Sequence, residues 1–158
     1  MTIPPLPQAV PLFSLLPASW RDLNSLRRFE REVFPQDSWP LFDLIAVLAL
    51  PGIHRIKAVS DGVLVGFAAA EFREGRDWIT TIGVMPAYRR MGIAQALLQA
   101  CESRLTAPLI RLCVRRSNLP AIRLYQKYGY HQVDTWRAYY NGGEDALVLE
   151  KIRDPGLT

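Results

Sequence analysis

The sequence predicts an α/β protein built on a mixed, mostly antiparallel sheet of about six to seven strands with flanking helices. Turn signals at 60–62 and 74–75 join three successive apolar segments as antiparallel hairpins. Strand, helix and strand then follow one another between 79 and 114, a passage that normally makes a parallel, right-handed crossover. A chain of 158 residues has the size of one domain, so we expect 1–158 to fold as a unit behind a loose arm at 1–10.

Composition is that of a globular protein with a mildly basic surface. Hydrophobic residues make up 49% and charged residues 22% of the chain. The formal charge of +4 suits a polyanionic cofactor or an acidic partner, and an ordinary basic surface accounts for it equally well. The first twenty residues contain five prolines and no charged side chain, which is unlike a signal peptide. The two cysteines, Cys101 on the apolar face of a predicted helix and Cys113 inside a predicted strand, fit a reducing compartment, so we expect a cytoplasmic location.

The elements of the first half follow from periodicity. We expect a strand at 12–16 and a helix that begins at Ser19, where Asp22 completes a capping box. A second helix is expected at 39–50, followed by strands at 54–59 and 63–72. The second helix is apolar nearly all round and too short to cross a bilayer, so it is either a buried helix or a wall of a substrate site. The buried stripe of the first helix is expected to contain Trp20, Leu23, Leu26, Phe29 and Val33.

An anion site is predicted where the central strand turns into a helix. Residues 79–85 form an apolar strand that Pro86 ends, and apolar spacing from Ile93 predicts a helix packed on the sheet. Gly92 lacks a Cβ and Ala94 has a small side chain, so a ligand can approach the unpaired N–H groups of the first helical turn. The helix dipole and the neighbouring arginines favour a phosphate there.

The second half predicts a further helix and a closing hairpin. A strand at 109–114 leads to a helix that Asn118 caps and Gly129 ends. Strands at 130–137 and 145–152 flank the glycine-rich turn after Asn141. Tyr125 lies on the inner face of the helix, a position that by itself is more typical of a core tyrosine than of a catalyst.

Three blocks resemble one enzyme family. Arg89, Gly92 and Ala94 match the coenzyme A motif Q/R-x-x-G-x-G/A of the GNAT N-acetyltransferase superfamily. The run VRRSNLPAIRLYQKYGY resembles the second block of that family, and WRAYYNGGEDALVLEKI is similar to the closing hairpin of its N-terminal protein acetyltransferases, especially the ribosomal-protein alanine group. The resemblance implies the GNAT fold, with a central parallel pair of strands splayed at the cofactor site, and acetyl-CoA as the cofactor.

The resemblance also implies roles for individual residues. Tyr125 would protonate the coenzyme A thiolate, Asn118 would bind the cofactor arm, and the slot for the acceptor would be lined by Tyr139 and Tyr140. The residues implied to bind the cofactor are Ile82, Gly83, Val84, Arg89, Arg90, Met91, Gly92, Ile93, Ala94, Asn118 and Tyr125.

The general base is where the sequence departs from this family. Cys113 stands where members of the group place a glutamate or a histidine, and a thiol in an apolar strand is a poor base. Other candidates are Glu71, Glu144 and Asp145, or a water chain to bulk solvent. An α-amine, with an unperturbed pKa near 7.7 to 8.0, needs less help than a lysine near 10.4.

These inferences predict an acetyl-CoA-dependent acyltransferase that transfers acetyl directly to an amine. The expected acceptor is the N-terminal α-amine of a protein or peptide; the alternatives are a small amine such as a polyamine or aminoglycoside, and a non-catalytic acyl-CoA-binding module. Neither nucleic-acid binding nor a membrane partner is expected, and the chain would be a monomer or homodimer. His54 and His131 are isolated in sequence, so no metal site is predicted.

Overall fold

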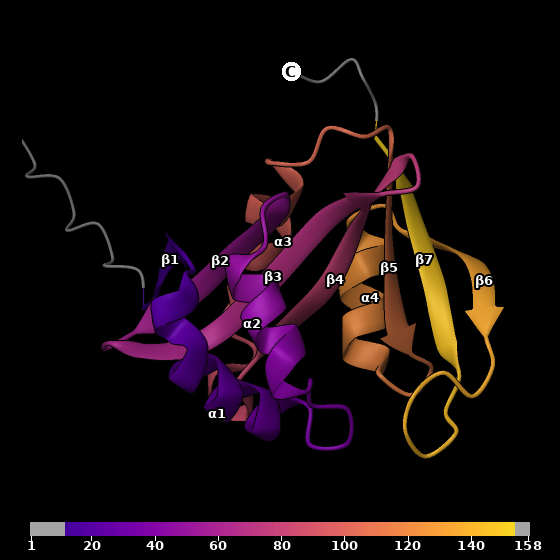
Figure 1. Cartoon of the computed structure of the whole chain (residues 1–158). Helices are drawn as coiled ribbons and strands as arrows, with labels where there is room; N and C mark the ends of the chain where they lie inside the picture. The colour runs from indigo at the N-terminus through magenta and orange to yellow at the C-terminus, as the bar shows by residue number, and fades with distance from the viewer. Residues whose placement is uncertain (1–11, 154–158) are drawn as a thin grey trace, which may run out of the picture.

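The computed structural model describes residues 12–153, which form a seven-stranded sheet with helices on both faces (Figure 1). The strand order is β1-β2-β3-β4-β5-β7-β6. The strands are β1 (Ser14–Pro17), β2 (Ile53–Ser60), β3 (Val63–Arg73), β4 (Arg76–Val84), β5 (Leu109–Arg115), β6 (His131–Trp136) and β7 (Ala146–Ile152). The α-helices are α1 (Leu23–Val33), α2 (Leu41–Ala49), α3 (Ile93–Glu102) and α4 (Leu119–Lys127). The arm expected at 1–10 lies outside the described residues.

The predicted hairpins are confirmed. Strands β2, β3 and β4 pair antiparallel in succession, and both connecting turns place two residues at positive φ. Asp61 and Gly62 have φ of 47° and 76°, and Glu74 and Gly75 have 54° and 80°, as tight two-residue hairpin turns require. Strands β4 and β5 pair in parallel, and the other neighbouring strands pair antiparallel. The sheet is therefore mixed and mostly antiparallel, as predicted.

The helices form two layers with separate apolar clusters. Helices α3 and α4 pack on one face, where Leu97, Leu98 and Tyr125 meet Ile110 and Leu112 of β5. Helices α1 and α2 cover the opposite face of β2 and β3; in Figure 1 α3 lies behind these strands, and α4 is seen between β4 and β5. No helix of residues 12–153 covers the outer part of that face, over β5, β7 and β6 (Figure 1).

The parallel pair separates after a short contact. β4 and β5 are paired only from Asp77 opposite Ile110 to Ile79 opposite Leu112. Beyond Ile79, the backbone of β4 keeps its ladder with β3 but has no partner in β5. The sheet is therefore open between the C-terminal ends of its two central strands, which confirms the predicted splayed pair.

Two expectations for the first half are wrong. Trp20 is 70% exposed, because Ser19 caps a 3-10 turn (Trp20–Asp22) before α1 begins, and this turn shifts Trp20 off the buried stripe. α2 is neither fully buried nor a wall of a cleft. It buries Leu44, Val47 and Leu48 but leaves Phe42 82% exposed.

Candidate active site

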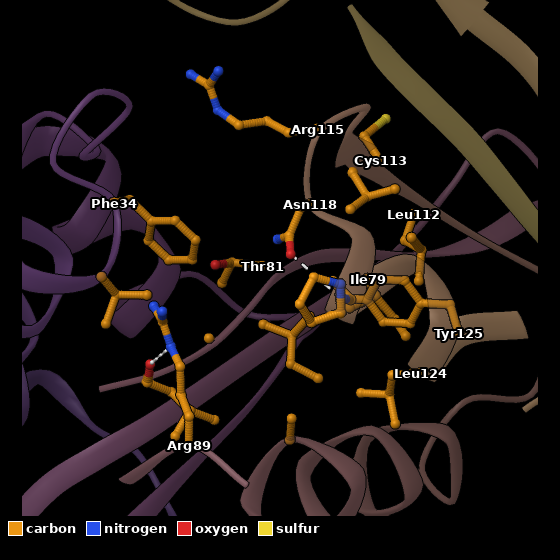
Figure 2. A pocket seen from close by; sticks show the side chains of 18 of the residues that line it. Phe34, Ile79, Thr81, Arg89, Leu112, Cys113, Arg115, Asn118, Leu124 and Tyr125 are labelled. Carbon is orange, nitrogen blue, oxygen red and sulfur yellow. Dashed lines mark hydrogen bonds between the residues drawn. The ribbon is translucent and has the colours of Figure 1, made fainter. Parts of the chain in front are cut away.

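A cleft of about 780 Å³ occupies the opening between β4 and β5. Figure 2 shows its side chains converging from several elements, with Phe34 on one side and Tyr125 on the other. The cleft contains most residues predicted for the cofactor, namely Ile82, Gly83, Val84, Arg89, Arg90, Gly92, Ile93, Ala94, Asn118 and Tyr125. Met91, Glu71 and Tyr139 are not among its lining residues.

The start of α3 provides a cradle for an anion. Gly92 has φ of 80°, and a Cβ built there would meet nothing within 4 Å, so the backbone faces open space. The first helical hydrogen bond runs from the N–H of Ala96 to the carbonyl of Gly92, which leaves the N–H groups of the first turn without a helical acceptor. This arrangement fits the pyrophosphate of coenzyme A.

Two arginines precede this cradle, and they differ in conformation and in contacts. Arg89 bends back so that its Nε donates to the carbonyl of Val84 at 3.4 Å (Figure 2). Arg90 is exposed and has φ of 63°, a left-handed conformation that turns the chain into Gly92. Both arginines line the cleft and add positive charge beside the helix N-terminus.

Asn118 and Tyr125 reach the cleft from α4. The Oδ1 of Asn118 accepts a hydrogen bond from the N–H of Ala121 at 3.3 Å, so its carbonyl caps the helix, and its amide nitrogen can donate to a ligand. The Tyr125 side chain is 5% exposed and packs edge-on against Tyr130, with ring centroids 5.9 Å apart. Burial raises the pKa of the Tyr125 phenol above its ordinary value, so the hydroxyl stays protonated at neutral pH.

The loop at 34–39 between α1 and α2 forms the other wall of the cleft, a role for which the helix after it was one candidate by sequence. Phe34, Pro35, Gln36, Asp37 and Trp39 line the cleft from this loop. The Phe34 ring lies directly on the backbone of β4 at Gly83. A Cβ added to Gly83 would come within 2.8 Å of the Phe34 Cζ. Gly83 therefore allows close packing between the loop and the strand, a role that a motif match does not reveal.

Arg115, at the end of β5, joins this loop to the β6–β7 loop. Its Nε donates to Asp37 at 2.9 Å and its Nη1 to Glu144 at 3.0 Å. The Asn141 backbone N–H also donates to Asp37, at 3.0 Å, and its side-chain amide donates to the carbonyl of Gln36 at 2.8 Å. The two loops are thus tied together across the mouth of the cleft.

A row of aromatic rings extends from the cleft over the uncovered part of the sheet. The guanidinium of Arg115 lies 4.6 Å from the ring centroid of Tyr140, which contacts Tyr139 at 5.1 Å. Tyr139 then meets Trp136 at 5.3 Å, and Trp136 stacks on Trp78 at 5.8 Å. Tyr140 lines the cleft itself, whereas Tyr139 lies outside it as an exposed neighbour.

The candidate bases differ in their surroundings. Cys113 lines the cleft, and burial raises the pKa of its thiol to about 11. Glu71 lies near the end of β3, opposite Trp78, and is 3.6 Å from the guanidinium of Arg73. Glu144 accepts hydrogen bonds from Ser117 and Arg115, which lower the pKa of its carboxyl. No unengaged carboxylate therefore lines this cleft among residues 12–153.

Within residues 12–153 no group of three or more potential ligands gathers around a metal position. No helix in this part of the chain is long and apolar enough to span a membrane.

Comparisons with known proteins agree with this geometry. The model of the acetyltransferase (GNAT) family matches residues 18–130. An N-alpha-acetyltransferase of Saccharolobus solfataricus is 29% identical over 155 residues, covering 88% of this chain and 92% of its own. The N-alpha-acetyltransferase RimI of Mycobacterium tuberculosis is 34% identical over 142 residues, covering 85% of this chain and 88% of its own. The crystal structure of Arabidopsis thaliana NAA60 in complex with acetyl-CoA superposes with a TM-score of 0.76 at 24% identity, over 89% of this chain and 98% of that one.

The family model covers well over half of the chain, and the cradle at Gly92 fits the cofactor of that family. The chain therefore belongs to the GNAT family and is an acetyl-CoA-dependent acetyltransferase.

Proposed function

We propose that this enzyme acetylates the N-terminal α-amine of a protein or peptide by direct transfer. The observation that carries the proposal is the position of the cleft in an opening of the sheet, with the anion cradle of α3 on one side and the loops at 34–39 and 137–145 on the other. A donor held at the cradle and a chain end held between the loops would meet at the free edge of β4. The relatives named N-alpha-acetyltransferase support this acceptor class.

The chain's own groups supply most of what the transfer needs. Bound acetyl-CoA supplies an activated acetyl group as a thioester. Backbone N–H groups of β4 beyond Ile79 have no partner in β5, so those directed at the cleft can donate to the thioester carbonyl as its oxygen gains charge. The protonated hydroxyl of Tyr125 can donate to the departing sulfur.

Deprotonation of the acceptor is left to solvent in this proposal. With its pKa raised to about 11, Cys113 is a neutral thiol at neutral pH and accepts no proton from an ammonium group. An α-amine has an unperturbed pKa of about 8, so an appreciable fraction arrives neutral at pH 7. This favours an α-amine acceptor over a lysine side chain, whose neutral fraction is roughly two hundredfold smaller.

A glutamate at position 113 should change the pH profile. In the wild type, kcat/KM should rise with pH and level off near the pKa of the acceptor amine, at about 8. Cys113→Glu places a carboxylate in the cleft, so the rising limb should move to lower pH and the rate at pH 6 should increase. Cys113→Ser, which offers no base, should leave the limb in place. If the rising limb of the pH profile moved in the serine variant, the thiolate form of Cys113 would be the group that accepts the proton.

The acceptor class is tested by thiol release from acetyl-CoA in the presence of peptides with different first residues, with spermidine and free lysine alongside. Turnover should be confined to peptides with a free α-amine and vanish when the same peptides are N-terminally blocked. Turnover of spermidine without any peptide would replace the proposal with a small-amine acceptor. Binding of acetyl-CoA with no turnover of any amine would replace it with a non-catalytic acyl-CoA-binding function.

The state of the cysteines supports a proposal for the compartment. Cys101 and Cys113 are both free thiols, as expected in a reducing environment. We infer a cytoplasmic enzyme.

A further inference from the structure

Helix α1 carries a carboxyl group inside an apolar cluster. Glu30 is 2% exposed and follows Phe29 on the helix face that packs against β3. Burial raises the pKa of this carboxyl to about 7, although a hydrogen bond from the backbone of Trp39 acts in the opposite direction. Burying a carboxyl group costs free energy unless its hydrogen bonds are replaced. Only one of its two oxygens has a partner among residues 12–153, so the site is not optimised for stability.

Glu30 holds both ends of the loop that faces the acceptor. Its Oε2 accepts the backbone N–H of Trp39 at 3.2 Å, and its backbone carbonyl accepts the N–H of Phe34 at 2.9 Å. The first contact depends on the side chain, whereas the second is the ordinary end of a helix. Removing the carboxyl would therefore release the Trp39 end of the loop while α1 keeps its own hydrogen bonds.

The loop between these two points forms contacts that set the width of the acceptor slot. The Phe34 ring rests on Gly83 of β4, and Asp37 accepts hydrogen bonds from Arg115 and Asn141 across the cleft mouth. A shift of the Trp39 end would move Asp37 relative to these partners. The cradle at the start of α3 is built from other elements and would be unaffected.

We propose that Glu30 is a positioning residue for the acceptor, which fixes the loop at 34–39 through the backbone of Trp39. This inference rests on the proposed function, because it assigns that loop to acceptor binding. A methionine of similar size would fill the same space without a buried carboxyl, and such exchanges are often neutral or stabilising. Fold stability alone thus gives no reason for a glutamate here, whereas placement of the loop does.

The test compares Glu30→Met with Glu30→Gln in the full-length enzyme. Glu30→Met should raise KM for the best peptide roughly tenfold, the scale of one lost hydrogen bond to a charged group, with kcat and the Kd of acetyl-CoA nearly unchanged. Its Tm should equal or exceed that of the wild type. Glu30→Gln keeps an oxygen acceptor for the Trp39 N–H and should restore KM to within about threefold of the wild-type value. Glu32→Met, at an exposed position on the same helix, is the matched control and should change none of these quantities.

Hydrogen exchange gives a readout that does not depend on turnover. The Trp39 amide should exchange faster in Glu30→Met than in the wild type or in Glu30→Gln, while amides of α3 keep their protection. Faster exchange at Trp39 with an unchanged peptide KM would overturn the positioning role. A lower Tm together with weaker acetyl-CoA binding in Glu30→Met would overturn it too, because Glu30 would then be a structural residue. If the wild type acetylates no peptide at all, the proposed function itself is wrong. That outcome differs from failure of the Glu30 role alone, in which the wild type acetylates peptides and Glu30→Met does so with an unchanged KM.

Discussion

Gly92→Glu is expected to abolish binding of acetyl-CoA and with it all transferase activity. The backbone at Gly92 faces open space at the positive end of α3, where the first-turn N–H groups have no helical acceptor. A glutamate would place a carboxylate where a phosphate is to be held, and its Cβ would be strained at φ of 80°. Isothermal titration with acetyl-CoA, with the melting temperature measured in parallel, checks the result.

Two further variants separate charge from backbone strain. Gly75→Glu introduces the same side chain at the same φ of 80° and also into open space, but in the β3–β4 turn away from the cleft. It should lower stability slightly and leave cofactor affinity intact. Gly92→Asn accepts a left-handed backbone more readily and carries no charge, so it should retain much of the affinity. If Gly92→Glu bound acetyl-CoA with wild-type affinity, the assignment of the pyrophosphate to the start of α3 would be wrong.

Local patterns predicted most of the fold. The positive φ values at Asp61, Gly62, Glu74 and Gly75 are what the two hairpin turns require, and these turns fix the neighbours of β3. The parallel partner of β4 followed from the handedness of a strand–helix–strand passage. Each of these inferences uses residues close together in the chain, where periodicity and turn chemistry dominate.

The acceptor side could not be predicted in the same way, because it is assembled from distant segments. Asp37 and Arg115 are 78 residues apart, and Asn141 contacts Asp37 from 104 residues away. The available signal was weak: a short polar stretch, Gln36 to Ser38, between two helices. The helix expected at 39–50 was one candidate for the wall of the slot, yet α2 leaves Phe42 exposed and the loop before it lines the cleft.

The same limit applies to the catalytic groups. Glu71 was a candidate by sequence because it ends a predicted strand, but the register of β3 places it opposite Trp78, where β4 and β5 are still paired and the sheet is closed. Cys113 was a candidate because of its position in the family match, and the structure places it among the residues that line the cleft. Whether the Cys113 thiol can act as a base depends on its pKa, which burial raises, and burial cannot be read from a motif.

Tyr125→Phe should lower kcat by roughly a hundredfold or more, the usual contribution of a positioned acid, with little change in the Kd of acetyl-CoA. The variant keeps the ring that packs against Tyr130 and removes only the hydroxyl in the cleft. Because burial raises the pKa of Tyr125, the wild type should show no loss of its acid below about pH 10, the ordinary pKa of a tyrosine. Rapid-mixing measurement of thiol release at saturating substrates isolates the chemical step.

Tyr130→Phe is the matched control, because it removes a phenol hydroxyl from the neighbouring ring. That hydroxyl donates to Glu102 at 2.7 Å and lies outside the cleft. Its loss should lower the free energy of unfolding by about 1 kcal/mol, since it leaves a carboxylate oxygen with one partner fewer, while kcat stays near the wild-type value. A large fall of kcat in Tyr130→Phe with none in Tyr125→Phe would mean that Tyr125 serves packing alone and that water protonates the departing thiolate.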